Sequence, residues 1–367
     1  MRWSYVPRWK FTDSCGRPSV PGALHLGCAH DAHTACHHAT RREFLRGGGA
    51  AIVGAAGLAT VVDPRDVFAQ VRVFPPPPPA VSPIAGLMDT HVHTAPDVFG
   101  RSVDDEEAAI LYKERGLEAL VLKNHVVSTA DRAWLLRKHV AGLNVFGGIV
   151  LNSPVGGINP DAVNWMWRMQ GGFGRVVWFP TFDADNHVKH FKDAPEGIKV
   201  LGADGKVLPA VREVLKICAE QKLVVHTGHL SPTEALAVIE AGRDAGVGRL
   251  VVTHAQFEVV NMSPDEMRKA ASMGAKLELC AMGTLMGPEA HLEWMRHWRR
   301  VKVEETAAAV KEIGAQNFVL ATDLGQTGNP SPADGLQLFV MDLVKAGVVK
   351  DDITKMGREV TGSLLMG

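Results

Sequence analysis

The chain has 367 residues, a net charge of −1 and a pI near 7, so its charge predicts neither a nucleic-acid partner nor binding to an anionic membrane. Hydrophobic residues make up 46%, enough for a large core, while the 6% of aromatic residues form no aromatic-basic pattern typical of single-strand binding. Three of the five cysteines precede residue 40, and the two that remain do not form a disulfide framework. We expect these two, Cys218 and Cys280, to be buried thiols. We therefore expect one large domain or two smaller ones.

Residues 1–69 predict an N-terminal extension with a signal peptide. In TRREFL, Arg41 and Arg42 precede the uncharged run 47–62, which is too short and too rich in glycine and alanine for a stable membrane span. Small residues permit cleavage after Ala69. TRREFL closely resembles the twin-arginine export signal, which implies a periplasmic or secreted protein exported in the folded state. Forty residues precede these arginines, so the true start codon stays open.

The Pro-rich segment 70–85 predicts a stiff spacer, and residues 86–367 predict the folded domain. There, strand-like apolar runs alternate with helical patterns, and SPTE (231–234) and SPDE (263–266) are helix-capping boxes. Eight such alternations predict an α/β fold, a closed (β/α)8 TIM barrel; an open doubly wound sheet is the alternative, but no GxGxxG or Walker motif is present. The predicted strands are 86–93, 118–125, 144–152, 175–182, 223–229, 249–256, 275–283 and 317–325.

Two segments, 153–172 and 181–210, interrupt the alternation after predicted strands, and we expect both as long loops on the C-terminal rim. The second contains a predicted hairpin with Asp204 and Gly205 at its turn. Four ring-bearing residues are candidates for lining a substrate pocket, the alternative being that they pack beneath the loops: Trp165, Trp167, Phe173 and His187. The segment 291–300 fits either the interface of a homo-oligomer or a helix on the rim.

Polar side chains end several of the predicted strands. Because the carboxyl ends of barrel strands meet at one rim, and residues two apart face the same side, these groups are expected to converge. Each alone fits a hydrogen-bonded structural role, but together they suit Zn²⁺ or a similar divalent cation, and burying them without a ligand would be unfavourable. The set is His91, His93, Lys123, His125, His226, His229, His254 and Asp323.

Four of these strand ends, DTHVH, VVHTGH, VVTHAQ and LATDLG, resemble the amidohydrolase superfamily of metal-dependent hydrolases, and most of all its phosphotriesterase and lactonase branch. The resemblance covers essentially residues 86–367, and the ending VTGSLLMG resembles the helix that closes many members. It implies metal ligands at five positions, with His254 alternatively an acid/base and Asp323 also the base that takes the water proton. The five are His91, His93, His226, His254 and Asp323.

One departure from the family concerns lysine. Binuclear members carry a carboxylated lysine, usually on the fourth strand, where this chain has VVWFPTF. Lys123 on the second strand is instead open to three roles: a carbamate bridge, a ligand for a substrate carboxylate, or a plain ammonium. We therefore expect one or two ions, with a preference for one, and we expect Asp89 to orient the ligands of the first strand.

The resemblance implies hydrolysis of an amide, lactone or ester by metal-activated water. Asp323 acts as the base; Lys123, His229 or His254 steadies the oxyanion, and His125 and His229 bind substrate. A non-oxidative decarboxylase, with Lys123 or His125 holding the carboxylate, is the alternative, and a non-catalytic exported metal- or ligand-binding protein is a second. The apolar rim favours a neutral or singly charged small-molecule substrate.

Overall fold

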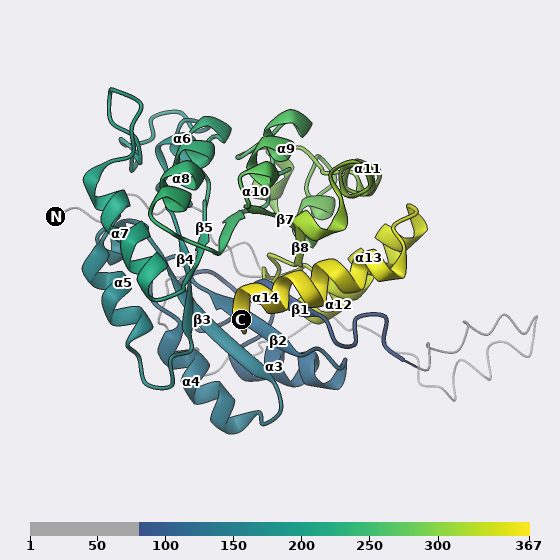
Figure 1. Cartoon of the computed structure of the whole chain (residues 1–367). Helices are drawn as coiled ribbons and strands as arrows, with labels where there is room; N and C mark the ends of the chain where they lie inside the picture. The colour runs from purple at the N-terminus through teal and green to yellow at the C-terminus, as the bar shows by residue number, and fades with distance from the viewer. Residues whose placement is uncertain (1–80) are drawn as a thin grey trace, which may run out of the picture. The chain divides into compact units, whose positions relative to one another are not determined.

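The computed structural model describes residues 81–367 (Figure 1). The predicted export signal, the cleavage position after Ala69 and residues 70–80 of the spacer lie outside the described residues. Within the described part of the chain, no helix is both long enough and apolar enough to cross a membrane.

Eight parallel strands form one sheet in which each strand pairs with the next along the chain, so the predicted (β/α)8 barrel is confirmed. The barrel closes where the end of β8 meets β1: the Asp323 N–H donates to the carbonyl of His91 at 2.8 Å, and the His93 N–H donates to that of Leu324 at 2.9 Å. The strands are β1 (Met88–His93), β2 (Ala119–Lys123), β3 (Asn144–Val150), β4 (Gly174–Trp178), β5 (Val224–His226), β6 (Leu250–Val252), β7 (Lys276–Cys280) and β8 (Phe318–Ala321).

Helices cover the outside of the barrel (Figure 1). Both predicted capping boxes are present, at Ser231 with Glu234 and at Ser263 with Glu266. The α-helices are α3 (Asp105–Glu114), α4 (Ala130–His139), α5 (Pro160–Trp167), α6 (Asp185–Val188), α7 (Pro209–Glu220), α8 (Pro232–Asp244), α9 (Pro264–Ser272), α10 (Glu293–Arg296), α11 (Val303–Ile313), α12 (Pro332–Lys345), α13 (Lys350–Thr354) and α14 (Thr361–Leu365). Short 3-10 segments are η1 (Ser153–Val155), η2 (Ala281–Leu285) and η3 (Ala315–Asn317), and η4 (Lys355–Val360) is a π-helical turn.

The two ends of the barrel interior differ in polarity. Apolar side chains such as Met88 and Val121 fill it toward the amino ends of the strands, and Leu364 and Leu365 of α14 belong to the same cluster. Gly362 lies beside the Met88 side chain, so α14 closes this end, as VTGSLLMG implied. The histidines of the predicted site lie toward the other end, as barrel active sites do.

The segment 153–172 is not the long rim loop that we expected. Only η1 and a few residues lie at the rim, because Asn159 caps α5 and Pro160 starts it, and α5 then covers the barrel like the other helices. Trp165 on α5 is 70% exposed, and Phe173 precedes β4 at the opposite end of the barrel, with the Arg137 guanidinium 4.1 Å from its ring centroid. Trp167 packs against the outer core, so these three rings do not line a pocket at the rim.

The predicted hairpin of the second segment is present in a minimal form. Leu201 and Val207 form one antiparallel bridge, and Gly205 takes a positive φ of 73° at the turn. The Gly202 N–H donates to the carbonyl of Lys206 at 2.8 Å.

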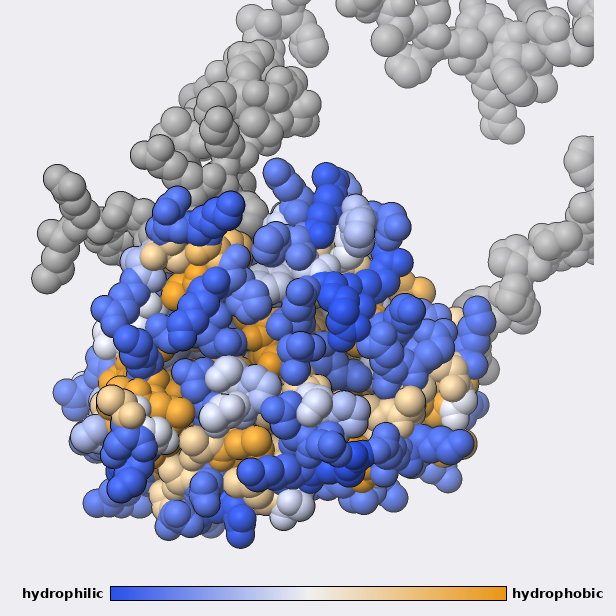
Figure 2. Space-filling view, turned by 90° about the horizontal axis from the view of Figure 1, so that it is seen from above, coloured by the Kyte–Doolittle hydropathy of each residue, from blue (hydrophilic) through white to orange (hydrophobic). Residues whose placement is uncertain are grey.

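Space-filling shows no single large apolar face in the direction viewed. Hydrophilic residues predominate in Figure 2, and the hydrophobic ones lie in several separate patches. Within residues 81–367, two clusters of buried apolar side chains lie inside the barrel and beneath its helices.

Glycine at position 325 is a requirement of barrel closure. Gly325 has φ +129°, and a Cβ there would lie 1.7 Å from the carbonyl oxygen of His93, within the seam between β8 and β1. Gly347 also has a positive φ, +96°, but a Cβ there meets nothing within 4 Å.

We predict that Gly325→Ala lowers the free energy of unfolding by roughly 3 kcal/mol or more, and Gly347→Ala by about 1 kcal/mol. Equal losses in urea denaturation would show that the seam tolerates a side chain.

Candidate metal centre

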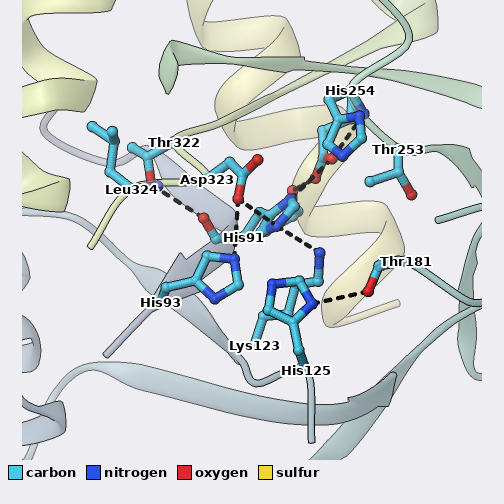
Figure 3. Close-up of polar contacts among 12 residues, drawn as sticks. His91, His93, Lys123, His125, Thr181, Thr253, His254, Thr322, Asp323 and Leu324 are labelled. Atoms are coloured by element: carbon cyan, nitrogen blue, oxygen red, sulfur yellow. Dashed lines mark hydrogen bonds and ion pairs between the residues drawn. The ribbon is translucent and has the colours of Figure 1, made fainter. Parts of the chain in front are cut away.

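Three predicted ligands meet at the carboxyl end of the barrel. His91 Nε2 and His93 Nε2 lie 2.9 and 3.0 Å from the same atom, Oδ1 of Asp323. The three side chains are buried and their candidate ligand atoms lie within 4.8 Å of one another. In Figure 3, the two imidazoles from β1 point toward Asp323, which follows β8. Residues 230 positions apart in the chain therefore offer three ligand atoms to one small volume.

The backbone at two site residues is unusual for side chains larger than glycine. His254 and Asp323, which follow β6 and β8, have φ values of 28° and 53°. Left-handed backbone costs roughly 1–2 kcal/mol at a non-glycine residue. Such conformations gather at functional sites, where surrounding contacts hold them in place.

His91 stands between two carboxylates. Its Nδ1 lies 3.1 Å from Glu278 Oε2, while its Nε2 faces both Asp323 Oδ1 at 2.9 Å and Lys123 Nζ at 2.9 Å. A neutral imidazole has one N–H, so if Nδ1 donates to Glu278, Nε2 turns a lone pair toward the Asp323 oxygen. Burial alone would lower the pKa of His91, but Asp323 overrides it and raises that pKa. Nε2 of His91 is therefore a candidate ligand atom for a cation.

Glu278 is the site residue that sequence reasoning missed. Its carboxylate accepts hydrogen bonds from Thr90 Oγ1 at 3.0 Å, from His91 Nδ1 at 3.1 Å and from the His254 N–H at 3.1 Å. His226 Nδ1 lies 3.8 Å away. Burial alone would raise the pKa of Glu278, but His91 and His226 hold it well below its usual range. Glu278 thus fixes groups from β1 and the ends of β5 and β6.

The sequence did contain a signal for this carboxylate. Glu278 lies inside β7, in KLELC, as an acidic residue between two leucines of a buried strand. A search for polar residues at strand ends misses Glu278, because this acidic residue lies in the middle of β7 and not at its carboxyl end. Cys280, two residues later, is buried as predicted, and burial raises its thiol pKa well above the usual value.

His226 and His254 are imidazoles with unused nitrogens. Both ring nitrogens of His226, and Nδ1 of His254, have no hydrogen-bond partner among the described residues. Burial lowers their pKa values to about 3 and about 4, so both rings are neutral and carry free lone pairs. An unpartnered buried polar group costs about 1–3 kcal/mol. Neither ring lies in the compact group of His91, His93 and Asp323, but this chemistry suits a cation at the site.

Lys123 is a buried cation at the end of β2. Apart from its 2.9 Å contact with His91 Nε2, its Nζ lies 5.5 Å from the ring centroid of Trp178, which ends β4. Burial lowers the pKa of Lys123, and Asp323 partly opposes this. Within residues 81–367 no carboxylate comes within the 4.0 Å ion-pair distance of Nζ. The fourth strand has no lysine and ends at Trp178. The indole N–H of Trp178 also has no hydrogen-bond partner among the described residues.

His125 and His229 lie farther out toward the mouth. His125 Nδ1 is 2.9 Å from Thr181 Oγ1, and His229 Nδ1 is 2.8 Å from Nδ1 of His187 on α6. Of the four pocket candidates, His187 is therefore the one that joins the site. Burial lowers the pKa values of His125 and His229 well below the usual range, so both rings are neutral.

Asp89 supports the first strand from behind, in line with the orienting role expected for it. Its carboxylate accepts from the Tyr112 hydroxyl at 2.6 Å, the His91 N–H at 3.0 Å and the Thr322 N–H at 3.1 Å. Burial raises the pKa of Asp89 to about 6. It ties together β1, α3 and the end of β8, which carry His91 and Asp323.

Comparison with protein families gives one match, "Family of unknown function (DUF6282)", over residues 86–278. The chain belongs to the DUF6282 family. The matched part of this DUF6282 chain ends at Glu278, so it contains the histidines of β1, β5 and β6 and the carboxylate of β7, while Asp323 follows it. Comparison with curated proteins gives no match.

Solved structures share the fold of the DUF6282 chain. An amidohydrolase from Pseudomonas aeruginosa matches with a TM-score of 0.51 and 11% identity over 77% of this chain and 96% of the other. The organophosphorus hydrolase from Deinococcus radiodurans matches with a TM-score of 0.50 and 15% identity over 77% and 92%. At such identities the likeness is one of fold, and it agrees with the architecture that the amidohydrolase resemblance implied.

A charge-removing substitution tests the supporting carboxylate of this DUF6282 chain. Glu278→Gln keeps the shape of the side chain but removes the negative charge that holds His91 and faces His226. We predict that the affinity for Zn²⁺ falls about 10- to 100-fold, measured by competition with a chelator. Glu289→Gln, at an exposed side chain paired with Arg300, is the matched control and leaves the affinity unchanged. Undiminished Zn²⁺ affinity in folded Glu278→Gln would remove Glu278 from the site.

Proposed function

We propose that this chain is a metal-dependent hydrolase that cleaves an amide, lactone or ester bond, and that its twin-arginine-like segment exports it to the periplasm or beyond. The observation that carries the enzymatic proposal is the meeting of His91 Nε2 and His93 Nε2 at one oxygen of Asp323. The neighbouring unpartnered nitrogens of His226 and His254 support it. The fold shared with an amidohydrolase agrees with it.

The residues present fit a divalent cation. His91, His93 and Asp323 would hold it, with His226 and His254 at hand to complete the set, and imidazole with carboxylate is a donor combination typical of Zn²⁺. When bound, such an ion lowers the pKa of a water molecule to about 7 and polarises a carbonyl group. We favour one ion, because β4 supplies Trp178 rather than a lysine.

Asp323 is the proposed base. Burial alone would raise its pKa, but His91 and His93 hold that pKa well below its usual range, so the carboxylate is deprotonated at neutral pH. It accepts the proton of the attacking water as the bond to the acyl carbon forms, and it returns a proton to the leaving group. Glu278 keeps the His91 N–H on the Nδ1 side, away from Asp323.

We propose that three groups act on the substrate. Lys123 donates toward the centre from β2, and His254 and His229 border it from the ends of β6 and β5. A donor in this water-poor position would stabilise the oxyanion of a tetrahedral intermediate. His125, which stacks on His93 with ring centroids 4.8 Å apart, is placed to contact the substrate beside it.

The Asp323→Asn variant tests the base. The amide keeps the shape and one potential ligand oxygen but cannot take up the proton, so we predict that Zn²⁺ stays bound while kcat falls by about 10²–10⁴. Metal content is measured beside turnover of a panel of lactones, esters and amides. Wild-type turnover by Asp323→Asn would show that the base lies elsewhere. If the unmodified protein binds metal but turns over no substrate of the panel, the result would favour a non-catalytic metal-binding protein over the hydrolase.

A non-oxidative decarboxylase is the second candidate, and Lys123 is the observation that favours it. Among residues 81–367 no carboxylate lies within 4.0 Å of the buried Lys123 Nζ, so this cation is suited to holding a substrate carboxylate. We expect this reaction to release carbon dioxide from aromatic or enol acids, measured by trapping the gas. Release of carbon dioxide with no hydrolysis of the ester and amide panel would replace the hydrolase proposal. Hydrolysis of the panel without release of carbon dioxide would retain it.

A further inference from the structure

A stack of three rings runs outward from the candidate metal centre. The rings of His93 and His125 are nearly parallel, 18° apart with centroids separated by 4.8 Å. His125 in turn stacks on Phe182, with a centroid separation of 4.1 Å and an angle of 28°. His93 ends β1, His125 follows β2 and Phe182 follows β4, so the stack connects a proposed metal ligand to a partly exposed ring.

A second series of rings converges on the same phenylalanine. His254 and His229 have centroids 4.9 Å apart, and His229 stacks on His187 at 4.8 Å. Phe191 lies 5.4 Å beyond His187. Phe182 meets this series as well, with its centroid 5.7 Å from His229 and 5.4 Å from His187. Phe182 is therefore the ring at which the two series join.

The outer rings of these series are partly exposed, and the imidazoles nearest to them are uncharged. Phe182 and Phe191 are each 37% exposed, while the imidazoles behind them are buried. Burial lowers the pKa of His187 to about 3, so that ring is neutral. Two cations that flank the rings are already paired, Lys189 with Asp185 and Arg299 with Glu305. A ligand that lies on Phe182 and Phe191 meets aromatic faces and edges there, while Lys123 lies deeper, beside His91.

We propose that the substrate carries an uncharged, planar aromatic ring that stacks on Phe182 and directs its acyl group toward His93 and Asp323. This names the substrate class and rests on the proposed hydrolase function. Aromatic rings gain from offset-stacked and edge-to-face contacts beyond the burial of their area. A saturated ring of similar size gains only from burial, so the two kinds of ligand separate the contributions.

The test compares benzamide with cyclohexanecarboxamide on the Zn²⁺-loaded protein by calorimetry. The cyclohexyl compound is the more hydrophobic, so burial alone predicts that it binds at least as tightly. We expect benzamide to bind about threefold to tenfold more tightly because it can stack. Equal binding, tighter binding of cyclohexanecarboxamide, or no binding of benzamide would overturn the proposal.

Three variants locate the preference. Phe182→Leu keeps an apolar side chain without a ring and is expected to abolish the preference for benzamide, while Phe182→Tyr keeps it. Phe173→Leu removes a ring at the opposite end of the barrel and leaves the preference unchanged. A preference that survives in folded Phe182→Leu would reject Phe182 as the stacking ring. Hydrolysis without any aromatic preference would reject this proposal alone, and aromatic preference without hydrolysis would reject the hydrolase alone.

Discussion

The structure depends on one imidazole held between two carboxylates. His91 reaches Glu278 through Nδ1 and Asp323 through Nε2, and these three residues come from β1, β7 and the end of β8. They meet only because β8 returns to β1 through the hydrogen bonds of Asp323 with His91 and of His93 with Leu324. Closure of the barrel therefore brings these three residues together.

The barrel divides its interior between stability and chemistry. The amino end is filled by apolar side chains and covered by α14, and this end supplies the burial that makes folding favourable. The carboxyl end buries two ionised carboxylates, Lys123 and several imidazoles, and nitrogens of His226 and His254 have no partner within residues 81–367. Each of those features opposes folding in the absence of a ligand. A bound cation would remove part of that cost, which links metal binding to the stability of this end.

The fold and the meeting of His91, His93 and Asp323 could be predicted because both follow from local patterns. Each apolar run became a strand, and His91, His93 and Asp323 converge because the carboxyl ends of parallel strands meet. Glu278 was not predicted because its role depends on partners in β1 and just after β6. The residues next to it in KLELC do not indicate those partners. The prediction of a long rim loop over 153–172 was wrong because Asn159 and Pro160 start a helix there. Ring stacking at Phe182 depends on loop geometry, which no spacing encodes.

We propose a single cation at this centre. The binuclear enzymes of the amidohydrolase superfamily, which the strand ends resemble, hold two ions with a carboxylated lysine. Here the indole of Trp178 ends β4, and Lys123 reaches the centre from β2 with its Nζ against His91 Nε2. A carbamate on Lys123 would place a third negative charge near Glu278 and Asp323, which His91 already separates by a single ring. In the one-cation arrangement that we propose, Lys123 would be available to bind substrate, and the aromatic stack from His93 to Phe182 would lead toward that centre.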